Sequence, residues 1–152
     1  MNQVLTSPVD EKIEAAFSAE SNPKTISEPV KATSTTTFKM GLFSNGVQLG
    51  WMGQTDSGWA VLVTDESKAI RLEQYPYNGV TYFRIATDTS RYMSVSNNSY
   101  IGFYNWLSAT GFTLKGSHLV ANYNGQQLSL YSTDNAYLYA WDAYTVLEVK
   151  FI

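Results

Sequence analysis

The chain has 152 residues, a formal net charge of −3 and 15% charged residues. This length suits one domain with a core of its own. The weak negative charge argues against a nucleic-acid-binding protein, which needs a basic face to neutralise phosphates, and against electrostatic attachment to anionic membranes. The absence of cysteine excludes disulfides and thiol chemistry.

Composition divides the chain into a tail and a folded body. Phe17 is the only aromatic residue within residues 1–36, whereas residues 37–152 contain all the others. A segment with few aromatic residues and much Ser, Thr, Lys and Glu is typical of weakly structured chain. We therefore expect an N-terminal tail over residues 1–36 and a single domain over residues 37–152.

The tail is expected to contain a short helix. Ser7 is a helix-capping residue and Pro8 suits the first helical position. Val9, Ile13 and Phe17 then recur at the spacing of one helical face. Such a helix either docks on the body or frays, or else it serves as an export leader or a partner contact, and the residues leave these alternatives open.

The tail carries no targeting signal of the Sec type. The first residues show no basic stretch followed by an apolar run. No apolar run elsewhere approaches the roughly 20 residues that span a bilayer. We expect no membrane span, and a protein that is cytoplasmic or released by a non-Sec route.

Strand signals follow one another from Phe38 onward, with turns between them. Asn45-Gly46 marks a hairpin because both residues tolerate positive φ. Tyr75 to Gly79 is expected to be a turn between units. The expected strands are 38–42, 47–51, 59–63 and 70–72 in a first unit, 82–85, 92–95, 100–106 and 112–114 in a second, and 119–121, 127–130, 137–141 and 146–151 in a third.

The same pattern occurs three times along the body. In each unit an apolar anchor follows a polar turn (Leu49, Met93 and Leu128), and a closing strand comes about twenty residues later. Three units are too few for a propeller, whose rings have at least four blades, and a flat sandwich would not explain a three-fold register. We expect an all-β fold of about twelve strands, in which three four-stranded units form a six-stranded barrel capped by three hairpins.

The second unit resembles repeats of the β-trefoil superfamily. The resemblance lies in Tyr82-Phe83-Arg84-Ile85, Arg91-Tyr92-Met93-Ser94-Val95 and Gly111-Phe112-Thr113-Leu114, which are similar to fascin-like and trefoil-lectin repeats. It implies a β-trefoil over the body, preceded by the tail, but no single function, because the fold hosts sugar binding, protease inhibition, actin bundling and growth-factor signalling. The Gln-x-Trp signature of ricin-type lectins is absent, so the sugar-binding residues of that family do not transfer.

No motif for catalysis or metal binding is present. His118 is the only histidine, and no Gly-x-Ser-x-Gly motif accompanies it. A surface or turn histidine is the simpler interpretation. Zinc and calcium sites need clusters of ligands that the sequence lacks, and no phosphate loop or dinucleotide fingerprint occurs. We expect no enzyme activity, no cofactor and no metal.

Aromatic residues give the clearest sign of binding. Within residues 100–106 and 137–142 every second side chain is expected to face the core, which leaves the rings between them facing outward. A sugar stacks its apolar face on such a ring, while its hydroxyls need fixed amide or carboxylate partners. Aromatic rings also fill trefoil cores, so a structural role stays open for each. The strips predict as ligand-binding residues Tyr104, Asn105 and Trp106 in the second unit and Tyr139, Trp141 and Asp142 in the third.

Polar turns lie beside these strips at matching places in the three units. They are usually simple turn chemistry, but their equivalence would give up to three similar pockets. The first unit lacks the aromatic strip and is expected to hold the weakest site. The turns add to the predicted ligand-binding residues Asn97 and Asn98, Asp134 and Asn135, and, in the first unit, Asp56 and Trp59.

These patterns together predict a non-enzymatic, multivalent carbohydrate-binding protein, a lectin. Glycans or glycoproteins are its expected partners, and a homo-oligomer would suit multivalent binding. Defence, adhesion and toxin targeting are roles for such a protein. The alternatives are a protein-binding trefoil, either a protease inhibitor or a receptor-binding toxin component, and a filament-binding module like fascin repeats.

Overall fold

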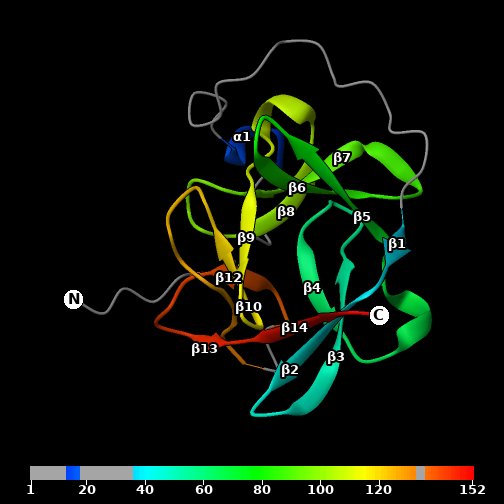
Figure 1. Cartoon of the computed structure of the whole chain (residues 1–152), viewed down its shortest axis with the longest axis vertical. Coiled ribbons are helices and arrows are strands. Elements are labelled where there is room, and N and C mark those ends of the chain that lie inside the picture. Colours follow the sequence, from blue (N-terminus) through cyan, green and yellow to red (C-terminus); the bar gives the residue numbers. More distant parts are fainter. Residues whose placement is uncertain (1–12, 18–35, 133–135) are drawn as a thin grey trace.

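A computed structural model of the chain describes residues 13–17, 36–132 and 136–152 (Figure 1). Within these ranges the fold is all-β, as predicted, and no helix is longer than the four residues of α1 (Ile13–Ala16). Two short 3-10 helices, η3 (Glu66–Lys68) and η4 (Trp106–Ser108), follow strands. The strands are β1 Thr37–Phe38, β2 Met40–Ser44, β3 Val47–Gln54, β4 Ala60–Val63, β5 Leu72–Tyr77, β6 Val80–Ile85, β7 Asp88–Val95, β8 Ile101–Tyr104, β9 Phe112–Lys115, β10 His118–Ala121, β11 Leu128–Leu130, β12 Leu138–Ala140, β13 Thr145–Val146 and β14 Glu148–Phe151.

The strands form three sheets. A five-stranded sheet has the order β1-β5-β6-β7-β8, a six-stranded sheet has the order β4-β3-β2-β14-β10-β9, and a three-stranded sheet has the order β12-β11-β13. Every ladder is antiparallel. The six-stranded sheet joins β2 to β14, so the beginning and the end of the body lie side by side.

Two hairpin turns follow from their Asn-Gly sequences. The predicted turn at Asn45-Gly46 is confirmed, with φ of 51° and 79°. Asn78-Gly79 has nearly the same φ values, 51° and 78°, and joins β5 to β6. The turn predicted over Tyr75 to Gly79 is therefore wrong in extent, because β5 continues to Tyr77. Pro76 is tolerated there because β1, the other neighbour of β5, pairs only with Leu72 and Glu73.

Gly79→Ala should lower the free energy of unfolding by roughly 1–2 kcal/mol, the cost of holding a residue with a Cβ at positive φ. A Cβ at this position meets no atom within 4 Å, so the loss comes from the backbone alone. Urea unfolding followed by circular dichroism measures it. Gly46 has nearly the same φ, and a Cβ there also meets no atom within 4 Å, so Gly46→Ala should lower the free energy of unfolding by the same amount. A neutral effect in either variant would contradict the type I′ turn.

The main core lies between the sheets and is almost wholly apolar. Two of the predicted anchors, Met93 and Leu128, are buried in it, with exposures of 0% and 1%. Leu49 is only partly buried, so the prediction of an anchor at that position is wrong. Met52, fully buried and paired with Leu62, takes its place, as Met93 pairs with Phe103 and Leu128 with Ala140.

The strands β4, β8 and β12 meet in a closed cycle. The residue before each strand bridges to the second residue of the next strand in the cycle, in the pairs Trp59↔Gly102, Tyr100↔Tyr139 and Tyr137↔Val61. Each bridge is extended by one backbone N–H···O bond, from Phe103 to Gly58 at 2.8 Å, from Ala140 to Ser99 at 2.9 Å and from Leu62 to Ala136 at 2.7 Å. The three strands are thereby fixed to one another at one end of the molecule.

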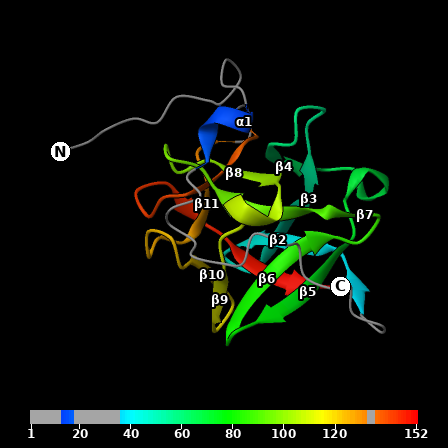
Figure 2. The same cartoon turned by 90° about the horizontal axis from the view of Figure 1, so that it is seen from above.

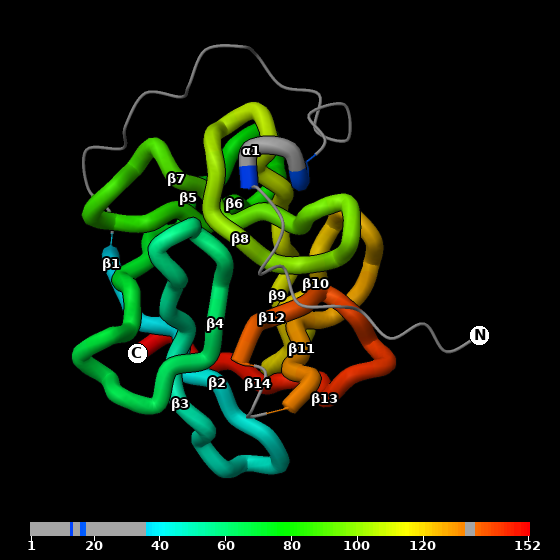
Figure 3. Tube along the Cα trace, turned by 180° about the vertical axis from the view of Figure 1, so that it is seen from behind, coloured from blue at the N-terminus to red at the C-terminus, as the bar shows by residue number. Residues whose placement is uncertain are grey.

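The predicted tail helix is not confirmed. Among the described residues of the tail only the single turn α1 is helical, and Phe17, which follows it, is not. The other residues of the predicted helix lie outside the described ranges. This turn lies against β8 (Figure 3). No helix in residues 13–17, 36–132 and 136–152 has the length and apolar character that a membrane crossing requires.

Candidate ligand-binding pocket

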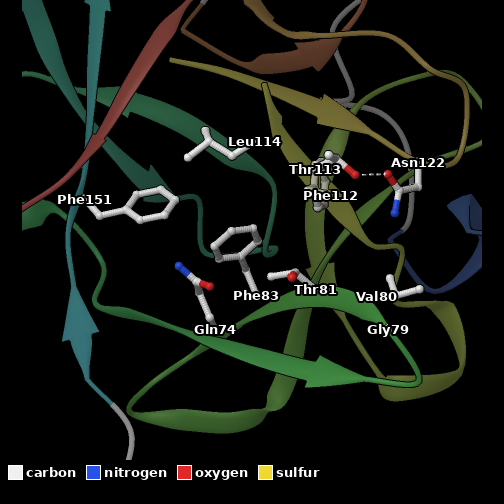
Figure 4. Close-up of a pocket in the computed structure, with 10 residues that line it drawn as sticks. All are labelled: Gln74, Gly79, Val80, Thr81, Phe83, Phe112, Thr113, Leu114, Asn122 and Phe151. Atoms are coloured by element: carbon white, nitrogen blue, oxygen red, sulfur yellow. Dashed lines mark hydrogen bonds between the residues drawn. The ribbon is translucent and has the colours of Figure 1, made fainter. Parts of the chain in front are cut away.

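A pocket of about 240 Å³ lies between the β5–β6 hairpin and β9 (Figure 4). Figure 2 shows these strands on one side of the molecule and α1 on the other. The pocket is lined by Gln74, Gly79, Val80, Thr81, Phe83, Phe112, Thr113, Leu114, Asn122 and Phe151.

The pocket exists because β6 and β9 lie near each other without pairing. β6 pairs with β5 along its whole length, but it pairs with β7 only at Arg84 and Ile85. β9 is the outer strand of the six-stranded sheet and pairs only with β10. Gly111 allows the close approach just before β9, because a Cβ atom there would overlap the Cγ1 methyl of Val80.

Phenylalanine rings form the floor of the pocket. Phe83 and Phe112 are each 2% exposed, and their ring centroids are 6.2 Å apart. Phe151 contacts Phe83 at 5.8 Å and stacks on Phe38 at 4.4 Å. Because each ring is held by others of the core, the floor is a rigid apolar surface.

The rim of the pocket carries neutral polar groups. The hydroxyl of Thr113 donates to Oδ1 of Asn122 at 2.8 Å, which fixes the amide and leaves its Nδ2 pointing away from that bond (Figure 4). Thr81 and Gln74 add a hydroxyl and a second amide on the β5–β6 side. None of the ten lining residues is charged.

This arrangement suits a small neutral ligand with one apolar face and several hydroxyls. The half-buried ring of Phe151 offers the exposed aromatic surface, with the buried ring of Phe83 behind it, and the rim offers both donors and acceptors. The volume lies below the roughly 300–1,000 Å³ typical of sites for drug-sized molecules, so a ligand of one ring is the better fit. The lining residues include no acidic, basic or histidine side chain.

His118 lies apart from the pocket. It is the first residue of β10, opposite Lys115 and Glu148, and is half-buried. Of the predicted surface or turn position, the turn is therefore wrong, and the side chain is partly exposed. Among the described residues, no three His, Cys, Asp or Glu side chains gather closely enough to hold a metal ion.

The predicted outward aromatic strips are wrong for two rings, because Trp106 and Tyr139 are only 3% and 0% exposed. Trp59, predicted as a ligand-binding residue beside the turn of the first unit, is also buried, at 2% exposed. Tyr104 and Trp141 are half-buried. Alternation placed Ile101, Phe103, Leu138 and Ala140 correctly in the core, but the opposite face of these strands is itself covered.

The cover over β4, β8 and β12 is the described part of the tail. Ile13 and Ala16 are buried against Trp59, Tyr100 and Tyr139 in a second apolar cluster. Phe17 adds ring contacts, 5.7 Å to Trp59 and 5.8 Å to Tyr104. Rings that alternation places away from the main core are therefore covered by Ile13, Ala16 and Phe17. Figure 3 shows α1 beside β8.

Trp106 is buried for a different reason. It lies beyond the end of β8 in η4, where it folds back onto the outer face of the β5–β6–β7 sheet. Its ring is surrounded by four tyrosine rings at centroid distances of 5.0–6.2 Å, those of Tyr75, Tyr77, Tyr82 and Tyr92. Burial, followed by the charge of Tyr77, raises the pKa of Tyr82.

A buried ion pair lies beside this cluster. Arg84 Nε donates to Glu73 Oε1 at 2.9 Å, and the two side chains are 2% and 3% exposed. Nη1 of Arg84 donates to the hydroxyl of Tyr92 at 3.2 Å, and the guanidinium lies 4.5 Å from the ring centroid of Tyr75. Burial alone would lower the pKa of Arg84, but the hydrogen bonds with Tyr92 and Glu73 outweigh it and raise that pKa.

Those of the predicted polar residues that the structure describes lie in turns or cap them. Asn105 caps η4 by accepting from Ser108 N at 3.1 Å, and Asp142 accepts from Gln127 N at 2.8 Å. Asp56, Asn97 and Asn98 are exposed in turns. Asp134 and Asn135 lie outside the described residues. None of the predicted residues lines the described pocket.

Sequence reasoning missed the pocket and the ion pair. Eight of the ten pocket residues come from the four strands β5, β6, β9 and β14, and the other two, Gly79 and Asn122, lie just outside strands. Some of them belong to the repeat-like segments, but nothing in the chain order shows that these strands meet around a pocket. The ion pair left a weak signal, because Arg84 stands within the otherwise apolar run Tyr82-Phe83-Arg84-Ile85. A cation in such a run needs a buried partner.

No protein-family model and no curated protein matches the chain. The resemblance to trefoil repeats therefore has only the internal features of this chain to support it.

Proposed function

We propose that the protein is a non-enzymatic carbohydrate-binding protein, a lectin, and that the pocket between β6 and β9 holds one sugar ring. The observation that carries this proposal is the pocket's composition, a floor of fixed phenylalanine rings under a rim of amides and hydroxyls. An aromatic floor supports stacking against the apolar face of a sugar. Asn122, Thr81 and Gln74 supply the donors and acceptors for its hydroxyls.

We also propose that the three units form a β-trefoil. The closed cycle of bridges among β4, β8 and β12 supports it, because every unit makes the same contact with the next. The shared pairing of Met52, Met93 and Leu128 supports it as well. In this arrangement β2, β5, β6, β9, β10 and β14 are the barrel strands, and the hairpins β3–β4, β7–β8 and β11–β12 cap the barrel.

The trefoil arrangement explains why the pocket belongs to the second unit. There the first and last strands, β6 and β9, lie side by side without pairing. In the first unit β1, which leads into β2, pairs with β5, and in the third β10 pairs with β14. Strand pairing closes the corresponding joints of these two units, so several copies of this pocket require more than one copy of the chain.

Asn122→Ala should weaken sugar binding about ten-fold, which corresponds to the loss of one or two hydrogen bonds. A glycan array identifies the ligand, and isothermal titration with that ligand measures the affinity of each variant. Asn122 is exposed, so the thermal transition should barely move.

Asn97→Ala is the matched control, because it removes the same group from an exposed turn outside the pocket. It should bind as the unaltered chain does. If Asn97→Ala loses affinity and Asn122→Ala does not, the sugar binds at the turns and the pocket proposal is wrong. A blank array from the folded protein would overturn the lectin proposal itself.

One observation favours a second candidate, a protein-binding role. Leu114 is 48% exposed on the outer strand β9, at the edge of the pocket. An apolar side chain of a partner protein would cover Leu114 and enter the pocket. A blank glycan array combined with inhibition of a protease panel would favour this candidate.

A further inference from the structure

The aromatic face beneath the N-terminal segment has the chemistry of a second site. We define this covered face by Trp59, Tyr100, Tyr104, Tyr139 and Trp141, which belong to one apolar cluster with α1 and Phe17. Its rings come from all three units, at the place where β4, β8 and β12 are bridged. It lies on the opposite side of the molecule from the β6–β9 pocket (Figures 2 and 3).

The described cover of this face is small. α1 is a single turn, and its apolar contacts come from Ile13, Ala16 and Phe17. One backbone hydrogen bond ties it to the body, from Asn97 N to Ala16 O at 2.8 Å. Among the residues that the structure describes, these contacts hold the cover on the body, and local opening of the cover is the step that exposes the face.

Two indole groups of the covered face are left unsatisfied. Nε1 of Trp59 and Nε1 of Trp141 are buried and have no hydrogen-bond partner among the described residues. Trp59 is only 2% exposed, so water does not compensate. A buried donor without an acceptor is unfavourable, and native proteins rarely keep one without a functional reason.

Glycines give this face the room that a ring needs. A Cβ at Gly102 would lie 3.1 Å from Cζ of Phe17, and a Cβ at Gly58 would lie 3.0 Å from Cδ1 of Ile13. The hollow at Gly102 is filled first by Trp59, whose Cε3 would lie 2.8 Å from such a Cβ, and Phe17 fills the rest of it. Release of the segment would open the part that Phe17 occupies, next to the Trp59 ring.

We propose that the covered face is a latent carbohydrate site and that α1 with Phe17 is its built-in competitor. A sugar ring takes the place of the Phe17 ring on Trp59 and Tyr104, and its hydroxyl oxygens accept from the two indole N–H groups. The ligand class, a sugar, rests on the proposed function. The site itself, and its control by α1 and Phe17, do not depend on the β6–β9 pocket. The apparent affinity of this site is reduced by the fraction of molecules in which α1 is docked.

Phe17→Ala tests the proposal in the full chain. The variant should bind at least one of D-galactose, N-acetyl-D-galactosamine and D-mannose about ten-fold more tightly than the unaltered chain. Trp59 and Trp141 should report the binding as a change in tryptophan emission. Phe17→Leu, which keeps an apolar side chain, is the matched control and should bind nearly as the unaltered chain.

Two further variants separate this site from the pocket. Asn122→Ala combined with Phe17→Ala should keep the added binding, because the pocket does not contribute to it. Trp59→Phe combined with Phe17→Ala should lose most of the added sugar binding, because an aromatic ring remains at position 59 but the indole N–H donor is gone. If Phe17→Ala does not fold, Ile13→Ala, a smaller loss of contact, takes its place with the same expectations.

The outcomes distinguish the latent site from the proposed function. A folded Phe17→Ala protein that binds no sugar more tightly than the unaltered chain overturns the latent site, even if the pocket binds. Binding that disappears with Asn122→Ala also overturns it, because the added affinity then belongs to the pocket. Binding that appears only after release of Phe17 and needs the Trp59 donor supports the latent site, even if the pocket proves empty.

Discussion

Replacing Glu73 with alanine should lower the free energy of unfolding by about 3–5 kcal/mol, because it leaves the guanidinium of Arg84 buried without its counter-charge. Arg84 is 2% exposed at its side chain and donates to Glu73 at 2.9 Å. An arginine side chain is not deprotonated in proteins, so loss of a proton does not relieve the variant. The remaining hydrogen bond to Tyr92 and the ring of Tyr75 recover only part of the loss.

The matched control removes both charges. Glu73→Leu with Arg84→Met keeps similar volumes, and replacing a buried pair with apolar residues is often neutral or stabilising. Urea unfolding at pH 7, followed by tryptophan emission and circular dichroism, measures both variants. If Glu73→Ala lost less than about 1 kcal/mol, water would have to reach Arg84 and the pair could not be buried.

The predictions that succeeded rest on short-range rules. Asn45-Gly46 predicted a hairpin because few other dipeptides accept positive φ at both residues, and both φ values are positive. Two-residue alternation placed Ile101, Phe103, Leu138 and Ala140 in the core, where they are buried. The all-β class followed from many such local signals, each decided within a few residues.

The predictions that failed needed contacts between distant parts of the chain. Alternation showed which face Tyr139 would take, but it does not show what covers that face, and the cover is formed by Ile13 and Phe17, more than a hundred residues earlier. Trp106 lies just beyond its strand, so the alternation rule no longer applies to it. A composition poor in aromatic residues made the tail look separate, yet its one aromatic ring packs on the body.

The pocket and the covered face place different demands on the sequence. The pocket needs only that β6 and β9 stay unpaired and that neutral polar residues occupy the rim, which many sequences satisfy. The covered face needs aromatic rings at fixed positions, with glycines beside them. The alternation of aromatic residues along residues 100–106 and 137–142 is visible in the sequence. Trp59 and Tyr139, which the sequence predicted to belong to an exposed site, are buried against Ile13 and Ala16 in the structure.

Met93→Asp should abolish the cooperative unfolding transition altogether. Met93 is fully buried and pairs with Phe103 at the centre of the main core. An unpaired carboxylate at such a position costs several kcal/mol, whether it stays charged or takes up a proton, and the methionine packing is lost as well. A domain of this size has only about 5–15 kcal/mol of stability in total, so the folded state is not expected to survive.

Two controls decide whether the position or the charge is responsible. Met93→Leu conserves volume and should cost less than about 1.5 kcal/mol. Leu49→Asp places the same carboxylate at a partly buried residue, from which it can turn to solvent, so this variant should fold with a smaller loss. Circular dichroism melts of the three variants make the comparison. A folded Met93→Asp protein, or a Leu49→Asp protein that unfolds equally, would contradict the register in which Met52, Met93 and Leu128 hold equivalent places. The proposed trefoil depends on that register, because three equivalent anchors are what allow three units to share one core.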